Sequence, residues 1–287
     1  MHAATSHLPR ALPQFLPSAR DGLQRFGLLH QPGAGRAVRG RVLFVHAFAE
    51  EMNKARRMAA LQAQALARAG FWVLQIDLLG CGDSDGDFGD ASWAAWQDDV
   101  RIGAEQLRHC GSSPLWLWGM RAGALLAAEV ASQLPEPAHC LFWQPASSGK
   151  QLLQQFLRLK TASGLISGQG KGAMAEVQAQ LDAGASVEVA GYQLPAALAK
   201  GLEKSRLTPP ALAEASPPRH LLWFELSTQA EASFSPVAQQ AHEAWRAAGW
   251  QLEAAMLQGP QFWQTTEIEE APALLAATLA AMERHAG

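Results

Sequence analysis

Along the chain, short apolar runs alternate with longer stretches in which apolar residues recur at helical spacing. Met58, Leu61, Ala65 and Ala69 follow one such run at helical spacing, and a second helix is expected from about 93 to 107 behind Ser92 as N-cap. The apolar runs, typical of buried strands, are 41–46, 71–78, 115–118, 139–143, 220–226 and 250–257. Strands that alternate with helices predict right-handed crossovers and a mainly parallel sheet flanked by helices.

The two ends of the chain extend this alternation. Short strands are expected at 14–17 and 25–31, separated by the turn residues Asp21 and Gly22, which predicts an antiparallel start to the sheet. Helices are expected at 235–248 and 271–285, on either side of the last strand. The fold class is therefore α/β.

The alternation stops between residues 145 and 218. This stretch is mainly helical, with a glycine-rich break at 163–172 and a proline-rich join at 208–218. Such a composition favours a helical cap inserted over the sheet. We therefore expect residues 1–144 and 219–287 to form the core, and 145–218 to form a helical cap insertion.

A strand, a tight turn and a helix are predicted within 114–134, PLWLWGMRAGALLAAEVASQL. Gly119 and Gly123 flank the turn, and Arg121 stands at its centre. The spacing is that of the G-x-S-x-G nucleophile elbow, in which the central residue is a serine.

Two further motifs stand in the matching order along the chain. His46-Ala47-Phe48 follows a strand where a His-Gly oxyanion turn would lie, and residues 77–84, DLLGCGDS, resemble a D-x-x-G-x-G-x-S turn. Taken with the elbow, this order resembles the α/β-hydrolase superfamily over nearly the whole chain. The resemblance implies the α/β-hydrolase fold, with a mainly parallel central sheet flanked by helices and a helical cap insertion.

A narrower resemblance is carried by five strings of the sequence. They are HAFAEEMNKARRM, DLLGCGDSDGDF, LWLWGMRAGALLA, WQPASSGKQLLQQFLRLK and GPQFWQTTEIEEAP. They resemble the exosortase A system-associated hydrolase 2 family. That resemblance implies a bacterial context beside exopolysaccharide and protein-sorting genes, and no defined substrate.

The residues of a serine triad are incomplete. Arg121 cannot act as the nucleophile, because a guanidinium stays protonated and offers no lone pair. Glu225 and Glu231 are candidates for the acid, but the loop 258–264 after the last strand has no histidine. The only later histidine, His285, stands near the end of the chain, so ordinary Ser-His-Asp hydrolysis is not expected.

Polar residues nevertheless gather at the expected carboxyl ends of the strands, where open α/β sheets bind ligands. Arg121 either grips a carboxylate or phosphate beside a helix N-terminus or plugs the serine position by pairing with Glu50, Glu51 or Asp83. The candidate catalytic residues are Arg121, His46, Glu50 and Glu51. The candidate ligand-binding residues are Asn53, Ala122, Gln144, Ser147, Trp143 and Trp263.

Each candidate also has a structural interpretation. His46 and the two glutamates could supply acid–base chemistry, or His46 could cap its strand while a glutamate pairs with a cation of the following helix. Trp143 and Trp263 are either core residues or a stacking wall for a ligand. Cys81 favours a structural thiol over a nucleophile, and the acidic string 83–90 lacks the closing glutamate of a calcium loop, so no metal is expected.

Composition narrows the setting of the protein. A net charge of −3, with 48% hydrophobic and 17% charged residues, is typical of a soluble globular protein and argues against nucleic-acid binding. Three cysteines without metal-ligand spacing favour a reducing compartment, and no membrane-spanning or signal segment is seen, so a cytoplasmic location is expected.

Two functional hypotheses follow from these observations. The first is a hydrolase-like enzyme that activates water at a non-serine site to act on an ester, amide or carbohydrate-linked substrate. The second is an inactive hydrolase fold that binds an anionic ligand or a partner protein. Neither requires a cofactor, and both leave substrate, partner and oligomeric state open.

Overall fold

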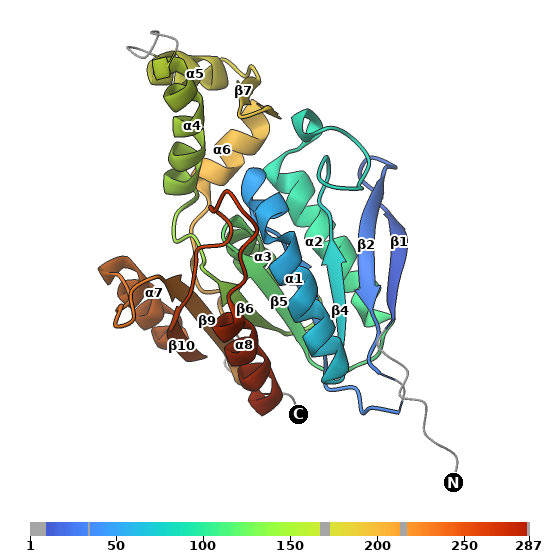
Figure 1. Cartoon of the computed structure of the whole chain (residues 1–287). Helices are drawn as coiled ribbons and strands as arrows, with labels where there is room; N and C mark the ends of the chain where they lie inside the picture. Colours follow the sequence, from blue (N-terminus) through green and yellow to red (C-terminus); the bar gives the residue numbers. More distant parts are fainter. Residues whose placement is uncertain (1–9, 34, 167–172, 213–216, 286–287) are drawn as a thin grey trace.

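The fold is built on one eight-stranded sheet with strand order β1-β2-β4-β3-β5-β6-β9-β10 (Figure 1). The computed structural model describes residues 10–33, 35–166, 173–212 and 217–285, with the backbone alone for 161–166 and 173. The strands of this sheet are β1 (Ala11–Pro17), β2 (Gln24–His30), β3 (Gly40–Val45), β4 (Phe71–Ile76), β5 (Leu115–Met120), β6 (Ala138–Trp143), β9 (Arg219–Ser227) and β10 (Trp250–Gln258).

Most of the sheet is parallel. The pairs β4·β3, β3·β5, β5·β6, β6·β9 and β9·β10 are parallel, whereas β1·β2 and β2·β4 are antiparallel. All six residues of β3 and of β5 are buried, as expected for strands covered on both faces. The predicted parallel sheet with an antiparallel start is confirmed.

Helices cover both faces of the sheet (Figure 1), and a hydrophobic core lies between each face and the helices that cover it. Val42 and Phe44 belong to the core beneath α1 and α8, whereas Leu43 and Val45 belong to the core beneath α2, α3 and α7. This division follows from the alternation of side chains along a strand. The flanking helices are α1 (Glu50–Arg68), α2 (Trp93–Arg108), α3 (Ala122–Ala131), α7 (Pro236–Ala247) and α8 (Pro272–His285), with a short 3₁₀ turn at Phe88–Asp90.

Local signals place these helices as expected. The Ser92 hydroxyl accepts the Ala95 N–H at 3.1 Å and caps α2, and Ser235 caps α7 in the same way. Gly70 has a φ of 102° directly after the end of α1, where glycine relieves the strain. In the described ranges, no helix is both long and apolar enough to span a membrane.

A separate group of elements lies between β6 and β9, at the carboxyl end of the strands (Figure 1). It consists of α4 (Gly149–Ile166), α5 (Ala173–Asp182), β7 (Val187–Val189), β8 (Tyr192–Leu194) and α6 (Ala196–Lys204). The β7–β8 hairpin was missed by the expectation of a mainly helical stretch. Its strands have three residues each and turn at Ala190-Gly191, both at positive φ, which is too short to give a periodic signal.

The cap boundaries at 145 and 218 remain a prediction. Phe156, Leu198 and Leu202 of this segment belong to the same hydrophobic core as α2 and α3, so the segment is packed onto the sheet domain. Parts of the predicted glycine-rich break and of the proline-rich join, residues 167–172 and 213–216, lie outside the described residues.

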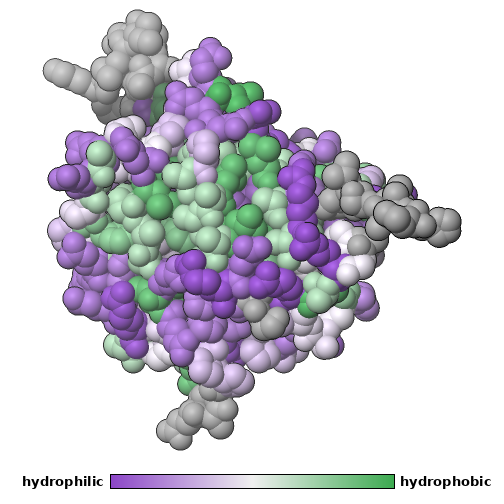
Figure 2. All heavy atoms as spheres, turned by 60° about the horizontal axis from the view of Figure 1, so that its bottom comes forward, coloured by the Kyte–Doolittle hydropathy of each residue, from purple (hydrophilic) through white to green (hydrophobic). Residues whose placement is uncertain are grey.

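Strand β10 forms one edge of the sheet and is only partly covered by α7 and α8. Its residues Ala254, Ala255, Met256 and Leu257 are half-buried. Figure 2 shows the molecule turned so that the bottom of Figure 1 comes forward. Apolar residues gather in the middle of the face seen in this view, and hydrophilic residues surround them.

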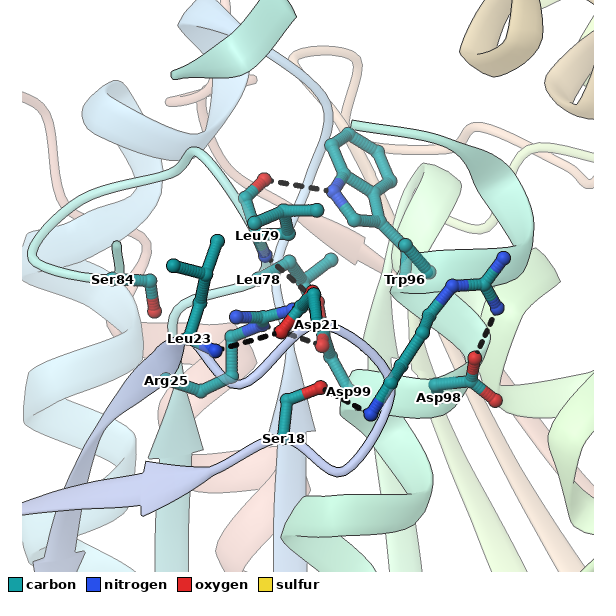
Figure 3. Close-up of polar contacts among 12 residues, drawn as sticks. Ser18, Asp21, Leu23, Arg25, Leu78, Leu79, Ser84, Trp96, Asp98 and Asp99 are labelled. Carbon is teal, nitrogen blue, oxygen red and sulfur yellow. Dashed lines mark hydrogen bonds and ion pairs between the residues drawn. The ribbon is translucent and has the colours of Figure 1, made fainter. Parts of the chain in front are cut away.

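A buried ion pair ties the antiparallel start of the sheet to α2. The Arg25 Nε of β2 lies 2.6 Å from the Asp99 Oδ1 of α2, and neither side chain is exposed. The second Asp99 oxygen accepts the Leu79 N–H at 2.7 Å, just after β4 (Figure 3). Asp21, in the β1–β2 turn, accepts a second hydrogen bond from Arg25 at 2.6 Å. Asp21 and Asp99 therefore share the Arg25 guanidinium, and Asp99 also holds the segment after β4.

Arg25 stays charged in this network. Burial lowers its pKa, but the ion pairs with Asp21 and Asp99 outweigh that effect and hold the pKa of Arg25 above its ordinary value. A charged group with no exposure depends on its partners, because it has no water to replace them.

We expect Asp99→Asn to destabilise the fold by about 3–5 kcal/mol, because it leaves the buried Arg25 charge without its fully buried carboxylate partner. Urea unfolding followed by circular dichroism measures this. The matched control is Glu105→Gln, which breaks the exposed pair with Arg108 and should cost at most about 1 kcal/mol. Equal midpoints for the two variants would contradict the role given to the buried pair.

Candidate functional site

Arg121 occupies a strained turn between β5 and α3. Its φ of 55° and ψ of −114° are rarely adopted by residues other than glycine. The flanking glycines are required by close contacts: a Cβ on Gly119 would lie 2.5 Å from the Ala124 Cα, and one on Gly123 would lie 2.1 Å from the Val45 carbonyl oxygen. The chain therefore keeps the backbone of a nucleophile elbow around an arginine.

A second strained turn lies beside the elbow. Ala49, the N-cap of α1, has a φ of 49° and a ψ of −125°. The contact of Gly123 with the end of β3 brings the two turns together. Ala122 is buried at the start of α3, where the first N–H groups of a helix have no partner within the helix, and the Arg121 side chain does not cap them.

The Arg121 side chain forms an ion pair with Glu51, near the start of α1. Its Nε donates to the two Glu51 carboxylate oxygens at 3.1 and 3.2 Å, and a terminal nitrogen lies 3.1 Å from Oε1. The side chains of Arg121 and Glu51 are 11% and 10% exposed. The same terminal nitrogen donates to Gln155 of α4 at 3.3 Å, and the guanidinium lies 5.7 Å from the Trp263 ring.

A cavity of about 300 Å³ lies above this ion pair, between α1, α4 and the loop after β10. Arg121 is not part of its wall, but Glu51, Gln155 and Trp263, which contact Arg121, are. The lining residues are Phe48, Glu50, Glu51, Lys54, Leu152, Gln155, Phe156, Leu159, Trp263 and Gln264. The arginine therefore lies directly beneath the floor of an open, partly aromatic cavity.

Both glutamates of the cavity are shifted towards their neutral form. Burial raises the pKa of Glu51, although the Arg121 charge opposes the shift. Burial also raises the pKa of Glu50, and the neighbouring Glu51 charge adds to this. The Glu50 Oε2 is buried and has no hydrogen-bond partner among the described residues. These carboxyls can exchange protons closer to neutral pH than ordinary glutamates do.

His46 lies outside this cavity. Its Nδ1 is 2.7 Å from the Ala47 carbonyl oxygen, and its Nε2 accepts the Leu78 N–H at 3.3 Å. Burial lowers the pKa of His46, which favours the neutral ring that these two contacts need. His46 instead lines a separate cavity of about 170 Å³ with Arg56 and Asp77. These are the contacts of a residue that holds the end of β3.

The two candidate tryptophans have different surroundings. Trp263 lines the cavity and faces Arg121, with its Nε1 buried and without a partner among the described residues. Trp143 lies in the core, where its Nε1 donates to the Thr278 hydroxyl at 2.9 Å and its ring packs edge-on against Trp118. The structure thus brings only one of them to the site.

The remaining candidate ligand-binding residues have structural contacts away from the cavity wall. The Asn53 amide donates to the Tyr192 hydroxyl at 3.2 Å, and the Gln144 side-chain oxygen accepts the Leu226 N–H at 2.8 Å. The Ser147 carbonyl accepts a backbone N–H at 3.1 Å. Of the residues expected from sequence, Glu50, Glu51 and Trp263 line the cavity, with Arg121 beneath it.

Sequence reasoning missed the contribution of α4 and the role of Lys54 in this cavity. Leu152, Gln155 and Phe156 lie on α4 at helical spacing, but an amphipathic pattern does not tell which part of the sheet the helix covers. Lys54 lies one helical turn after Glu50 and Glu51 on α1, which was the available signal.

The positions of a triad hold other residues. The loop after β10 supplies the buried Phe262 and Trp263. His285 lies 4.4 Å, ring to ring, from His220 and 3.0 Å from Glu253, away from the elbow cavity. Glu225, on β9, accepts the Trp223 Nε1–H at 2.7 Å, and burial raises its pKa.

Two other chemistries find no support in the described part of the chain. Burial raises the pKa of the Cys81 thiol, which disfavours the thiolate that a nucleophile needs. Asp83 donates its backbone N–H to Asp77 at 3.0 Å, and the Ser84 hydroxyl bonds the Asp77 carbonyl, so this turn is fixed by its own contacts. Among the described residues, no group of His, Cys, Asp or Glu side chains is arranged to hold a metal.

Comparisons with known proteins agree with this architecture. Residues 36–167 match the family model of the serine aminopeptidases, S33. No curated protein matches the chain. The matched stretch contains the elbow, Ala49 and α1, but it covers less than half of the sequence.

Solved structures similar to the chain include three from bacteria. Est1E from Butyrivibrio proteoclasticus with bound ferulic acid has a TM-score of 0.65 at 14% identity, covering 94% of this chain and 96% of its own. A hypothetical protein from Pseudomonas aeruginosa has a TM-score of 0.63 at 13% identity, covering 99% and 96%. An α/β serine hydrolase without a lid from Xanthomonas campestris has a TM-score of 0.53 at 17% identity, covering 96% and 93%.

Neither the family model nor these structures identify the exosortase-associated family, so that resemblance stays a prediction from the sequence. At these identities the structural likeness establishes the fold. Together with the parallel sheet and the strained turn between β5 and α3, it identifies the chain as a protein of the α/β-hydrolase fold that carries Arg121 at the nucleophile elbow.

Proposed function

We propose that the chain binds a small ligand with a carboxylate or ester group in the cavity above the elbow, and that it does not use serine catalysis. The observation that carries this proposal is the Arg121–Glu51 ion pair beneath an open cavity of about 300 Å³. A purely structural plug would need no cavity above it. The strained backbone and the two required glycines hold this geometry in place.

The walls of the cavity set the class of ligand. Phe48, Phe156 and Trp263 offer aromatic surface, and Leu152 and Leu159 add aliphatic surface, which suits an aromatic or acyl body. Lys54 and the buried Arg121 offer positive charge for a carboxylate or a polarised carbonyl. The structural neighbour Est1E was solved with ferulic acid, an aromatic carboxylic acid, which makes ferulate a suitable probe.

The ligand and Glu51 compete for Arg121. Glu51 is buried and its pKa is raised, so it takes up a proton more readily than an exposed glutamate. Once Glu51 is neutral, Arg121 loses its ion-pair partner and attracts an anion. Binding of a carboxylate is therefore linked to protonation of Glu51.

Glu50 supports a second candidate function, the hydrolysis of an ester, amide or carbohydrate-linked group by activated water. Its raised pKa and its unpartnered oxygen are properties of a general base. In this function Glu50 takes a proton from water as the water oxygen bonds to the carbonyl carbon, and Arg121 and the first N–H groups of α3 stabilise the oxyanion. The bond to the leaving alcohol or amine then breaks, and Glu50 returns the proton to that group. The resemblance to an exosortase-associated family would place either function in an exopolysaccharide or protein-sorting context.

We expect ferulate binding by the wild type to strengthen as the pH is lowered from about 8, because Glu51, whose pKa is raised by burial, takes up a proton before the ferulate carboxylate does. Glu51→Gln removes the competing charge, so it should bind ferulate about tenfold more tightly at pH 8 and lose most of the pH dependence. Isothermal titration calorimetry at each pH measures both effects.

Glu50→Gln is the matched control for that experiment, since it makes the same substitution in the same cavity without touching Arg121. It removes a second titrating carboxyl of the cavity, so the pH dependence should weaken but persist, because Glu51 still titrates against Arg121. Absence of ferulate binding at every pH, or the same pH dependence in Glu51→Gln and the wild type, would refute the proposed competition for Arg121.

We expect the wild type to show no labelling by a fluorophosphonate probe and no hydrolysis of p-nitrophenyl acetate above the buffer rate, because Arg121 offers no nucleophile. Turnover that disappears in Glu50→Gln but persists in Asn53→Ala would instead favour the second candidate function. Labelling of the wild type by the probe would contradict both.

A further inference from the structure

Another cavity lies at the amino ends of the parallel strands, opposite the end that carries the elbow. It has a volume of about 240 Å³ and includes Arg41 of β3, His139 of β6 and Arg219, the first residue of β9. The elbow stands at the other end of β5, so this cavity shares no residue with the one above Arg121. Its chemistry is separate from that of the proposed function.

The two arginines of this cavity are used differently. Arg41 is engaged on all sides: its Nε donates to the Ser113 carbonyl at 2.7 Å, and its terminal nitrogens bond the two Glu136 oxygens at 3.1 and 2.5 Å. Arg219 donates one hydrogen bond, to the Ala138 carbonyl at 3.3 Å. Within the described ranges, no carboxylate pairs with Arg219, and its Nε is buried without a partner.

The charges of the cavity therefore do not balance. Glu136 is neutralised by Arg41, and no other carboxylate of the described residues compensates the charge of Arg219. Burial lowers the pKa of Arg219, as expected for a guanidinium that loses water without gaining a carboxylate. An anion in the cavity would supply the missing partner.

Neutral donors stand beside this guanidinium. The His139 Nδ1 accepts the His220 backbone N–H at 3.0 Å, so a neutral His139 ring carries its proton on Nε2 and offers a donor there. The Ser113 hydroxyl, also in the cavity wall, is buried without a partner among the described residues. The wall thus holds more hydrogen-bond donors than the protein itself satisfies.

The titratable groups nearest to Arg219 are basic rather than acidic. Burial lowers the pKa of His139 to about 4, and the charges of His220, Arg219 and His285 add to this shift. Glu253, the acidic residue beside His285, is occupied by His285 at 3.0 Å and by Arg284. No acid on the neighbouring described elements is therefore left to balance Arg219.

We propose that this cavity is a binding site for a small oxyanion, a phosphate or carboxylate group, held by Arg219 with His139 and Ser113 as further donors. A guanidinium presents two parallel N–H groups that match two oxygens of such a group. Pro114, Pro137 and Pro218 form a rigid, solvent-exposed apolar rim around it.

Calorimetric titration of the wild type at pH 7 with sodium phosphate, and separately with sodium acetate, tests the site against sodium chloride at equal ionic strength. We expect saturable binding of phosphate or acetate by the wild type. Arg219→Gln should bind the same anion at least about tenfold more weakly. Arg206→Gln is the matched control, because it removes an exposed arginine that also bonds backbone carbonyls but lies outside this cavity.

The two anions decide the source of the ligand, since a response to phosphate alone assigns a phosphate group and a response to acetate alone assigns a carboxylate. No binding of either anion, or equal affinity in Arg219→Gln and the wild type, overturns the proposal. If phosphate binds, NMR titration of the wild-type His139 ring needs no variant, because phosphate is still an anion at about pH 4: bound phosphate should raise the pKa of His139 from about 4, and an unchanged pKa at saturating phosphate overturns the proposal.

Discussion

The close approach of Gly123 to the end of β3 is the contact on which the site depends. A side chain at that position would overlap the Val45 carbonyl, so α3 can start beside β3 only with glycine there. The chain must then turn sharply at Arg121, at a positive φ. This geometry fixes the place of the elbow residue before its chemistry is chosen, and here the residue is an arginine.

An arginine in that place changes what the rest of the site must do. Its charge is nearly removed from water and needs a buried partner, which Glu51 provides from the start of α1. Gln155 and Trp263 complete its surroundings from α4 and from the loop where a catalytic histidine would be expected. The replacement is thus accommodated by several elements together, and the cavity above them stays open to a ligand.

An arginine stands at each end of the parallel strands, and the two differ in whether a carboxylate of the protein balances their charge. At the carboxyl edge, the buried Arg121 has its own carboxylate, and a ligand must compete with Glu51. At the amino edge, Arg219 has no described carboxylate and faces a cavity. The inner charge of Arg25 is a third case, since its two aspartates satisfy it within the fold. Only the first two arginines are placed to meet a ligand.

The sequence by itself determined the fold class, the order of the strands along the chain and the elbow with Arg121 at its centre, because these depend on local periodicity and on short-range turn chemistry. It also predicted that the residues of a serine triad are incomplete. Tertiary structure alone decided that Glu51 pairs with Arg121, that His46 and Trp143 lie away from the cavity, and that α4 supplies part of its wall. Those outcomes depend on contacts between residues distant in sequence, which periodicity does not encode.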